Sequence, residues 1–440
     1  MKNVLKQGLL ISATSFLFFS VSCSAQKENS GDKKLNEIVS SKEVKRIVST
    51  LASDEMRGRK TFTPDIDKAA DFVANEFKAA GLQKFDSHHN YKQEFSMVTA
   101  KLQNLFGTFD NAAIDEKNVV VITCQPEIII TENSGFEKIA IPAGKNFFSE
   151  ARKLIQANKN YFVLVDTSYS RNFSRLSGLK RGLFKSDKSV VFVLTDSDPQ
   201  KFSIEAHHEI SEQKLANVVG VLPGKSKKDE YVIFSGHYDH IGIGRPVDGD
   251  SIYNGANDDA AGTTAVILLA KYFKALGNNE RTLVFAAFTA EEVGGFGSQY
   301  FSRQFDPEKV QAMFNIEMIG TESKWGKNSA YITGFEKTDM GAILQKSLEG
   351  SGFTFYPDPY PQQQLFYRSD NATLARLGVP AHTISTSKMD SEPNYHKVSD
   401  EVETLDMENM TEIIKAIAIS SKSIIAGKET PSRVKVEELR

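Results

Sequence analysis

Potential metal ligands recur in the second half of the 440-residue chain, close to apolar stretches that read as strands. They are His237 and Asp239 after YVIFSG, Asp258 and Asp259 in the glycine-framed loop NGANDDAAG, Glu291 and Glu292 after RTLVFAAFTA, and Glu317 after VQAMFNI. Imidazole and carboxylate groups together form a ligand set that suits zinc. The chemistry that this pattern indicates is metal-assisted hydrolysis.

Each of these groups also has an ordinary explanation. Asp258 and Asp259 are well placed to cap the helix that follows them, because acidic side chains stabilise the first turn of a helix. A His-x-Asp pair often belongs to a hydrogen-bonded loop, and adjacent glutamates usually lie in solvent. Glu317 fits such explanations least well, since it lies within the apolar sequence MFNIEMIG and a buried charge needs a partner.

A further potential ligand, in addition to these four groups, lies far along the chain. His396, in the stretch YHKVSD, is one of eight histidines and follows a long polar loop. In open α/β sheets the functional site lies at the carboxyl ends of the strands. Four successive groups at such ends, plus a histidine carried in by a loop, favour a site that holds two metal ions.

The surrounding sequence predicts the elements that position these groups. From residue 217 onward, apolar strands alternate with helices such as AAGTTAVILLAKYFKAL, and strands that are apolar on both faces belong to a sheet covered by helices on each side. We therefore expect an α/β fold, a three-layer α/β/α sandwich with a mixed, mostly parallel central sheet. An early helix, DKAADFVANEFKAAGL, places Ala69, Phe72, Val73 and Phe77 on one stripe and ends at Gly81.

The first 22 residues have two lysines near the start and an apolar run at 9–19, which is typical of a secretory signal and short for a membrane span. The segment SVSC resembles a bacterial lipobox that ends at Cys23, although Ser20 replaces the usual leucine; cleavage after Ala25 is the alternative. Either reading predicts export, to the periplasm or as a lipoprotein anchored in the outer membrane through Cys23. The other cysteine, Cys124, lies in the apolar run NVVVITC and is expected to be a core thiol without a disulfide partner.

The expected organisation has five parts: a signal peptide at 1–22, a flexible tether at 23–37, a catalytic domain formed by 38–100 and 213–428, an inserted or lid-like α+β segment at 101–212, and a polar C-terminal tail at 429–440. Charged residues make up 25% of the chain, and the net charge is −3. This balance argues against nucleic acid as a partner. The sequence leaves the oligomeric state open.

The ordered motifs HYDHIG, NGANDDAAG, TAEEVGGFGS, NIEMIG and YHKVSD resemble the co-catalytic dizinc exopeptidases that include bacterial leucyl aminopeptidase and aminopeptidase Y. The resemblance covers about residues 217–425, and LASDEMRGRKTFTPDIDKAADFVANEFKAAGL also resembles the opening of that family. It implies the following ligands: His237, Asp258 and Glu317 for one zinc ion, and Asp258, Glu292 and His396 for the other.

The resemblance also implies the remaining roles. Asp239 orients His237, the Asp258–Asp259 peptide bond is cis, and Glu291 is the general base for a bridging water activated by the two zinc ions. The implied function is an exported zinc aminopeptidase that acts on peptides. Many family members carry aspartate where this chain has Glu317, a glutamate that is one methylene longer but still within reach of a metal.

Several assignments stay open at this level. Tyr367 is a candidate to hydrogen-bond the oxyanion, Arg368 and Asp370 are interpreted as a structural ion pair, and His240 and His382 as local structural histidines. Two other functions remain as alternatives: a glutaminyl cyclase-like acyltransferase with a single zinc ion, and a non-catalytic, receptor-like lipoprotein. The residue preferred at the substrate N-terminus is not evident from the sequence.

Overall fold

The computed structural model describes residues 30–85 and 90–439. The predicted signal peptide, Cys23, Ala25 and the first part of the tether lie outside these residues. Within them, we find no helix with the length and apolarity needed to cross a bilayer.

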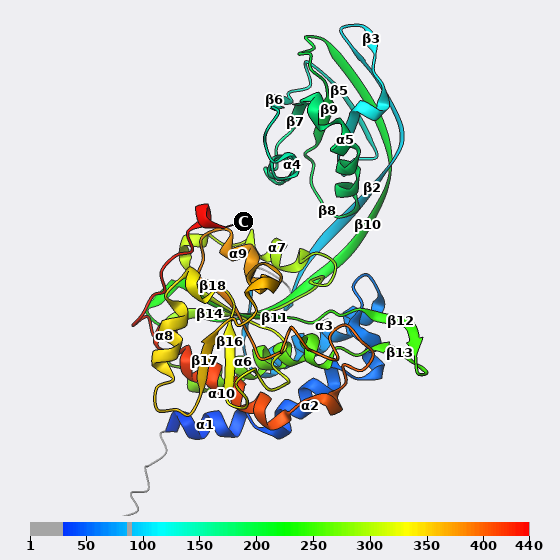
Figure 1. The fold of residues 1–440 in the computed structure, drawn as a ribbon. Helices are drawn as coiled ribbons and strands as arrows, with labels where there is room; N and C mark the ends of the chain where they lie inside the picture. Colours follow the sequence, from blue (N-terminus) through cyan, green and yellow to red (C-terminus); the bar gives the residue numbers. More distant parts are fainter. Residues whose placement is uncertain (1–29, 86–89, 440) are drawn as a thin grey trace, which may run out of the picture.

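The central sheet is mixed and has helices on both faces, which confirms the predicted three-layer α/β fold (Figure 1). The expectation of a mostly parallel sheet holds only for its centre, because the long strands on one side pair antiparallel. Its strand order is β17-β16-β18-β15-β11-β14-β10-β2-β3. The parallel neighbours at its centre are β11 (Lys227–His237), β14 (Arg281–Phe288), β15 (Val310–Ile316) and β18 (Ala381–Ser385). At one edge, β16 (Ser329–Ile332) runs antiparallel to β18 and parallel to β17 (Thr354–Pro357).

Side chains of the central strands alternate between two buried layers. Phe234 and Phe285 face one hydrophobic core, whereas Ile233 and Val284, their neighbours in the chain, face another. The first core is covered by α1 (Ser30–Ile38), α2 (Ser41–Leu51), α3 (Pro64–Ala79), α6 (Gly262–Leu276), α8 (Met340–Ser347) and α10 (Met407–Ser420). The second is covered by α7 (Phe296–Ser302) and α9 (Asn371–Ala375). The two cores produce the three layers.

The helix α3 follows the predicted stripe. Ala69, Val73 and Phe77 are buried, Phe72 is half-buried, and Gly81 has a φ of 73°, as a helix C-terminus commonly requires. The next long helix, α6, is buried around nearly its whole circumference, because the sheet covers one side and other helices cover the rest.

The prediction of a flexible tether at 23–37 is wrong for its last residues. The helix α1 begins at Ser30, and Leu35 is buried in the first core. The ammonium of Lys34 also donates to the carbonyl of Ala275 at the end of α6. The sequence SGDKKLNEI looks polar because only one face of this helix packs against the domain.

Two long strands connect the predicted catalytic part, which contains the centre of the sheet and the helices that cover it, to an outer lobe (Figure 1). The strands β2 (Lys92–Phe109) and β10 (Phe202–Leu222) pair antiparallel from Lys92 opposite Val218 to Phe109 opposite Phe202. Eighteen residues at the usual rise per residue of a strand span about 60 Å. The expected boundaries at 101 and 212 therefore fall inside continuous strands, where backbone pairing carries the sheet from one part into the other.

The outer lobe, here residues 110–201 together with the ends of β2 and β10 that flank them, is an α+β unit. Its own sheet has the order β4-β9-β7-β6 and is formed by β4 (Val119–Ile122), β9 (Val190–Leu194), β7 (Tyr161–Val165) and β6 (Glu137–Ile141). The helices α4 (Phe147–Gln156) and α5 (Ser170–Phe173) pack on this sheet. At the other end of the chain, the polar tail is held to the catalytic part, because Arg281 donates to the carbonyl of Glu429 and Val434 is buried.

Candidate active site

The predicted ligands meet at one edge of the central sheet. His237 is the last residue of β11, Glu317 follows β15, and Glu291 and Glu292 follow β14 after a short turn. Because β11 pairs parallel with both β14 and β15, these three strands end side by side. The loop before α6 brings Asp258 to the same edge, and the loop between β18 and α10 brings His396.

The first group of donors is His237, Asp258 and Glu317, whose ligand atoms lie within 4.8 Å of one another. His237 Nε2 is 3.2 Å from Asp258 Oδ1. Two ligands bound 2.0–2.1 Å from one tetrahedral ion stand about 3.3 Å apart. In addition, His237 Nε2 and Glu317 Oε2 are buried without a hydrogen-bond partner in the described chain. The donor set thus has the spacing and the unmet polar atoms of a zinc site.

The second group shares Asp258. Its other carboxylate oxygen, Oδ2, is 3.2 Å from His396 Nε2, and that nitrogen is 3.2 Å from Glu292 Oε2. The two oxygens of Asp258 therefore face different donor groups, which is the geometry required of a ligand that bridges two ions. The Asp258–Asp259 peptide bond is cis, as expected.

His240, interpreted from the sequence as a local structural residue, belongs to this second group. Its Nδ1 is 2.8 Å from Glu292 Oε1 and 4.0 Å from Asp258 Oδ2. The ring is buried, and neither nitrogen makes a hydrogen bond of normal geometry within the described chain. A second histidine three residues beyond His237, in HYDHIG, was the sequence signal for this role, but the direction of its ring depends on the loop after β11.

Asp239 occupies a different position from the one expected. Its Oδ1 is 3.8 Å from His237 Nδ1, too far for a hydrogen bond, and the nearer atom to that nitrogen is the Asp239 backbone oxygen at 3.2 Å. The carboxylate instead accepts hydrogen bonds from the backbone N–H groups of Glu291 and Glu292 and from the Thr61 hydroxyl. It thus fixes the turn that carries the glutamate pair.

The loop that carries Asp258 is held in place by Asp400, the carboxylate of the YHKVSD stretch. Asp400 accepts hydrogen bonds from the N–H groups of Asn257 and Asp258 at 2.8 and 3.0 Å. Beneath the loop, the fully buried Arg59 donates to the carbonyls of Tyr238, Asn254 and Gly255. Arg59 comes from the early segment MRGR, which explains why residues far from the ligands in sequence belong to this site.

Asp259 has the capping role considered for it. Its carboxylate accepts hydrogen bonds from Gly262 N–H at the start of α6 and from the N–H groups of His237 and Met318. It joins three of the segments that supply ligands. Burial raises the pKa of its carboxyl group well above the usual range.

Carboxyl groups outnumber cations at this edge, and burial dominates their titration. Burial raises the pKa of Glu317 to about 7 and that of Asp239 to about 6, and it raises the pKa of Glu291 well above the usual range. Burial alone would raise the pKa of Glu292, but the rings of His240 and His396, 2.8 and 3.2 Å from its carboxylate oxygens, hold it at about 2. So many buried carboxyl groups carry full charge together only if cations neutralise them.

A cavity opens next to these donors. Asp258, Glu291, Glu317 and His396 line it on one side, and the rest of its wall is mixed polar and apolar, including Met318, Tyr331, Leu365, Met389 and Tyr395. Glu291 is thus the member of the glutamate pair that faces the cavity, while Glu292 faces the second donor group. This division agrees with different roles for two adjacent residues.

The side chains of the segment FYRSD do not have the contacts predicted from the sequence. Tyr367 does not line the cavity; it is half-buried and packs against Phe366. Tyr395, which the sequence reasoning missed, lines the cavity and stacks on His396 with ring centroids 3.9 Å apart. The expected ion pair is also absent from the described residues, because Arg368 donates to Gln363 and Asp370 is buried with both oxygens unpartnered.

His382 and Cys124 lie away from the site. His382 is a satisfied core residue: its Nδ1 is 2.8 Å from the Thr333 carbonyl oxygen and its Nε2 is 2.8 Å from the Thr338 hydroxyl. Cys124 is half-buried rather than in the core, because β4 ends at Ile122 and the thiol lies at the edge of the outer lobe. Burial raises the pKa of the Cys124 thiol.

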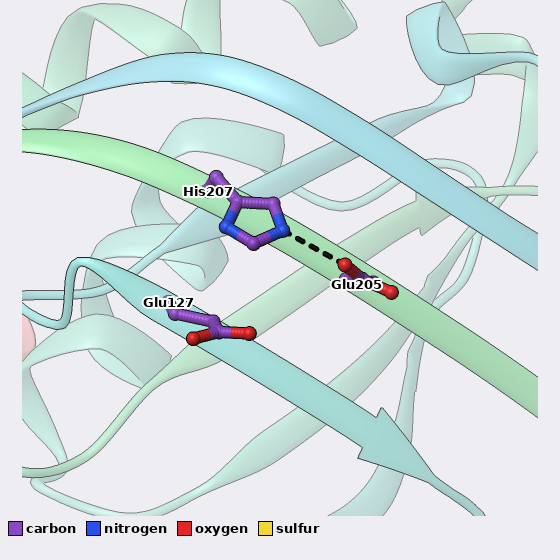
Figure 2. Close-up of side chains that lie close together, drawn as sticks. All are labelled: Glu127, Glu205 and His207. Atoms are coloured by element: carbon purple, nitrogen blue, oxygen red, sulfur yellow. Dashed lines mark hydrogen bonds and ion pairs between the residues drawn. The ribbon is translucent and has the colours of Figure 1, made fainter.

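One further histidine–carboxylate group lies in the segment where the sequence showed no convincing ligand cluster. Figure 2 shows Glu127 on β5 (Glu127–Thr131) close to Glu205 and His207 on β10. His207 Nε2 forms an ion pair with Glu205 Oε1 at 2.8 Å, and the side chains of both residues are more than a third exposed. Solvent and this pair satisfy the group without a metal ion.

Comparison with known proteins agrees with this architecture. Residues 217–420 match the family model for Peptidase family M28. A protein of Trichophyton verrucosum described as a probable leucine aminopeptidase is 31% identical over 209 residues, which cover 45% of this chain and 54% of that protein. The chain therefore matches about half the length of this relative.

Two solved structures resemble the whole chain. The aminopeptidase from Aneurinibacillus sp. strain AM-1 superposes with a TM-score of 0.52 at 17% identity, over 93% of this chain and 98% of that one. A Peptidase M28 precursor from Shewanella amazonensis SB2B superposes with a TM-score of 0.52 at 14% identity, over 92% and 98%. At these identities the likeness establishes the shared fold.

Proposed function

Because residues 217–420 match the family model for Peptidase family M28, we propose that the protein is a zinc-dependent aminopeptidase that removes N-terminal residues from peptides. One observation carries the proposal. Two donor groups of imidazole and carboxylate share Asp258 and lie beside a cavity that Glu291 also faces. The relative described as a probable leucine aminopeptidase supports the same reaction.

We assign the ligands of two zinc ions from the spacing of the donors. His237, Asp258 and Glu317 hold one ion; Asp258, Glu292 and His396 hold the other, with His240 as an additional donor. Bound zinc supplies a Lewis acid and lowers the pKa of water. A glutaminyl cyclase-like site needs one ion, so two complete donor groups favour the aminopeptidase.

Glu291 is the general base in this proposal. It lines the cavity, and the hydrogen bond from its backbone N–H to Asp239 holds its turn in place. The carboxylate removes a proton from the attacking water and returns it to the nitrogen of the leaving amine, which balances the hydrolysis. Tyr395 is the side chain best placed to donate a hydrogen bond to the developing oxyanion, because it lines the same cavity.

The cavity wall supports a preference for apolar N-terminal residues. Met318, Leu365 and Met389 contribute apolar surface, while the acidic donors lie at one side. An apolar side chain gains free energy by leaving water for such a wall. The acidic side favours a substrate with a free, positively charged amino terminus.

We also propose that the protein is exported, on the basis of the predicted signal at 1–22. Mass spectrometry of the mature N-terminus distinguishes a lipid-modified Cys23 from cleavage after Ala25. Detection of an unprocessed chain that starts at Met1 in the cytoplasm would contradict export.

The central test combines metal content with activity. We expect two zinc ions per chain by elemental analysis, hydrolysis of leucine p-nitroanilide that a chelator abolishes, and no hydrolysis of its N-acetylated form. Glu291→Gln is expected to keep both zinc ions and to lower kcat by about 1000-fold or more. A Gln variant with normal activity would disprove the role of Glu291, and equal cleavage of the acetylated substrate would disprove the aminopeptidase.

A further inference from the structure

A large cleft separates the outer lobe from the catalytic part. It encloses about 1060 Å³ and is lined on one side by α4, the end of β4 and the segment 182–190, and on the other by α7, the turn before it and the end of α9. These elements come from the two lobes that Figure 1 shows joined by β2 and β10. The cleft is separate from the cavity beside the metal donors, since the two share no lining residue.

All the charged side chains that line the cleft are basic. The outer lobe contributes Arg152, Lys153, Lys159, Lys185 and Lys188, and the catalytic part contributes Arg303 and Arg376. No aspartate or glutamate is among the described residues that line it. This sign is unexpected for a chain whose net charge is −3. A concave surface lined by charge of one sign concentrates the field and attracts ligands of the opposite sign.

Three arginines of the cleft have no carboxylate partner among the described residues. The four lysines each have a carboxylate of the surrounding surface as partner, for example Glu212 at 2.7 Å from Lys185. In contrast, Arg152, Arg303 and Arg376 line the cleft and form no ion pair within residues 30–85 and 90–439. Guanidinium groups bind carboxylates through two parallel hydrogen bonds, so unpaired arginines are the side chains best suited to carboxylate ligands.

Aromatic packing fixes the two walls relative to each other. Phe184 of the outer lobe contacts Phe296 and Tyr300 of the catalytic part, with ring centroids 6.1 and 6.2 Å away. The guanidinium carbon of Arg303 lies 4.2 Å from the centroid of the Phe184 ring. These contacts cross between the lobes and form part of the cleft lining, so the basic residues of both walls face a defined space.

The cleft adjoins the candidate active site through two short segments. Gly294 and Phe296 line the cleft, while Glu291, three residues before Gly294, lines the cavity. The N–H of Gly294 donates to the carbonyl of Glu291, so this turn is compact. Likewise, the segment that ends at Arg376 in the cleft begins at Arg368 and Ser369 in the cavity.

We propose that the cleft binds acidic residues of the peptide substrate, located C-terminal to the bond that is cleaved. The substrate class is peptides that carry several aspartates or glutamates after an apolar N-terminal residue. This inference rests on the proposed aminopeptidase function, and it gives the outer lobe a role in selecting substrates.

The test compares two heptapeptide amides that begin Leu-Ala-Ala and continue with four glutamates or four glutamines. We expect kcat/KM to be about tenfold higher for the glutamate peptide, and the ratio to approach one in 0.5 M salt, where charges are screened. In the variant R152Q/R303Q/R376Q the ratio should fall to about one at low salt.

The matched control is K117Q/K201Q/R245Q, which also removes three positive charges, from exposed residues outside the cleft. Its ratio should stay about tenfold. Equal loss in both variants would show that net charge, rather than the cleft, selects acidic peptides. A ratio of one in the parent protein would overturn the inference while leaving the aminopeptidase proposal intact.

A direct binding measurement distinguishes the two proposals if the cleft binds acidic peptides but the protein is not a peptidase. A fluorescent, N-acetylated tetraglutamate peptide cannot be a substrate of an aminopeptidase, and its anisotropy reports occupancy of the cleft. Binding that is lost in R152Q/R303Q/R376Q but kept in the control, without hydrolysis of any free peptide, would support the cleft and disprove the peptidase. Tighter binding of an eight-residue oligothymidylate than of the peptide would overturn the assignment to peptides.

Discussion

The chain contains histidine–carboxylate groups in both lobes, and they differ in their surroundings. In the catalytic part, His237, His240 and Asp258 are almost fully buried, and several of their neighbours' polar atoms lack hydrogen-bond partners in the described chain. In the outer lobe, His207 and Glu205 are partly exposed and pair with each other (Figure 2). Similar residue types therefore meet opposite electrostatic conditions.

The difference shows what distinguishes a candidate metal site from a surface cluster. A buried carboxylate without a partner is unfavourable, so the catalytic group needs a cation or must bind protons. An exposed ion pair is hydrated and contributes little to stability. Burial and polar atoms without partners, rather than residue composition, therefore distinguish the candidate metal site from the surface cluster.

Removing the shared ligand should have the largest effect. Asp258→Ala takes one oxygen from each donor group, so we expect both zinc ions to be lost and kcat/KM for leucine p-nitroanilide to fall by about 1000-fold or more. Elemental analysis and kinetics measure the two effects. Retention of two zinc ions would contradict the bridging geometry, and the surface substitution Glu205→Gln serves as the matched control.

A second prediction concerns a buried histidine that is not a ligand. Burial lowers the pKa of His382 to about 4 from an ordinary value of 6.5. Between these values the unfolded chain binds a proton that the folded protein does not, so the neutral ring loses its stabilising effect as the pH falls from about 6.5 to about 4. The loss amounts to about 3 kcal/mol.

Urea unfolding of the parent and of His382→Gln at pH 7 and pH 4 measures this effect. The advantage of the parent over the variant should shrink at the lower pH. An advantage that is constant across this range would show that His382 does not titrate as its buried position predicts.

His240 sharpens the comparison within the catalytic group. If its ring is a donor to the second ion, His240→Ala should weaken binding of one zinc ion by about 10- to 100-fold and leave the other unchanged. Competition with a chromophoric chelator measures both affinities without reference to activity. If both zinc affinities were unchanged, His240 would have a structural role and would not be a zinc ligand.

The smallest effect is expected in the outer lobe. The double variant Glu205→Gln and His207→Gln should change the free energy of unfolding by less than about 1 kcal/mol and leave the zinc content unchanged, because the pair is exposed. Calorimetry with and without added zinc measures this. If a third zinc ion stabilised the parent but not the variant, the exposed Glu205–His207 pair would also be a metal site, and the contrast with the buried donors would be wrong.

Local sequence was sufficient for the core of the fold and for most of the candidate site. The apolar strands and α3 follow from periodicity, and His237, Asp258, Glu292, Glu317 and His396 came from strand ends and motifs. The helix α1 was missed because a short polar segment has one buried face that periodicity over nine residues does not reveal. The sequence suggested Tyr367 for the cavity, whereas Tyr395 lines it, because loop conformation decides which aromatic ring faces the cavity.

The sequence by itself determined the strands, their apolar faces and the types of donor at their ends, because strand and helix periods are properties of neighbouring residues. Tertiary structure alone decided that His240 turns toward Glu292, that Asp239 holds the glutamate turn, and that basic residues of two lobes line one cleft. These contacts join residues tens to hundreds of positions apart. Their distances depend on how the strands pair and how loops pack, and no local pattern encodes that information.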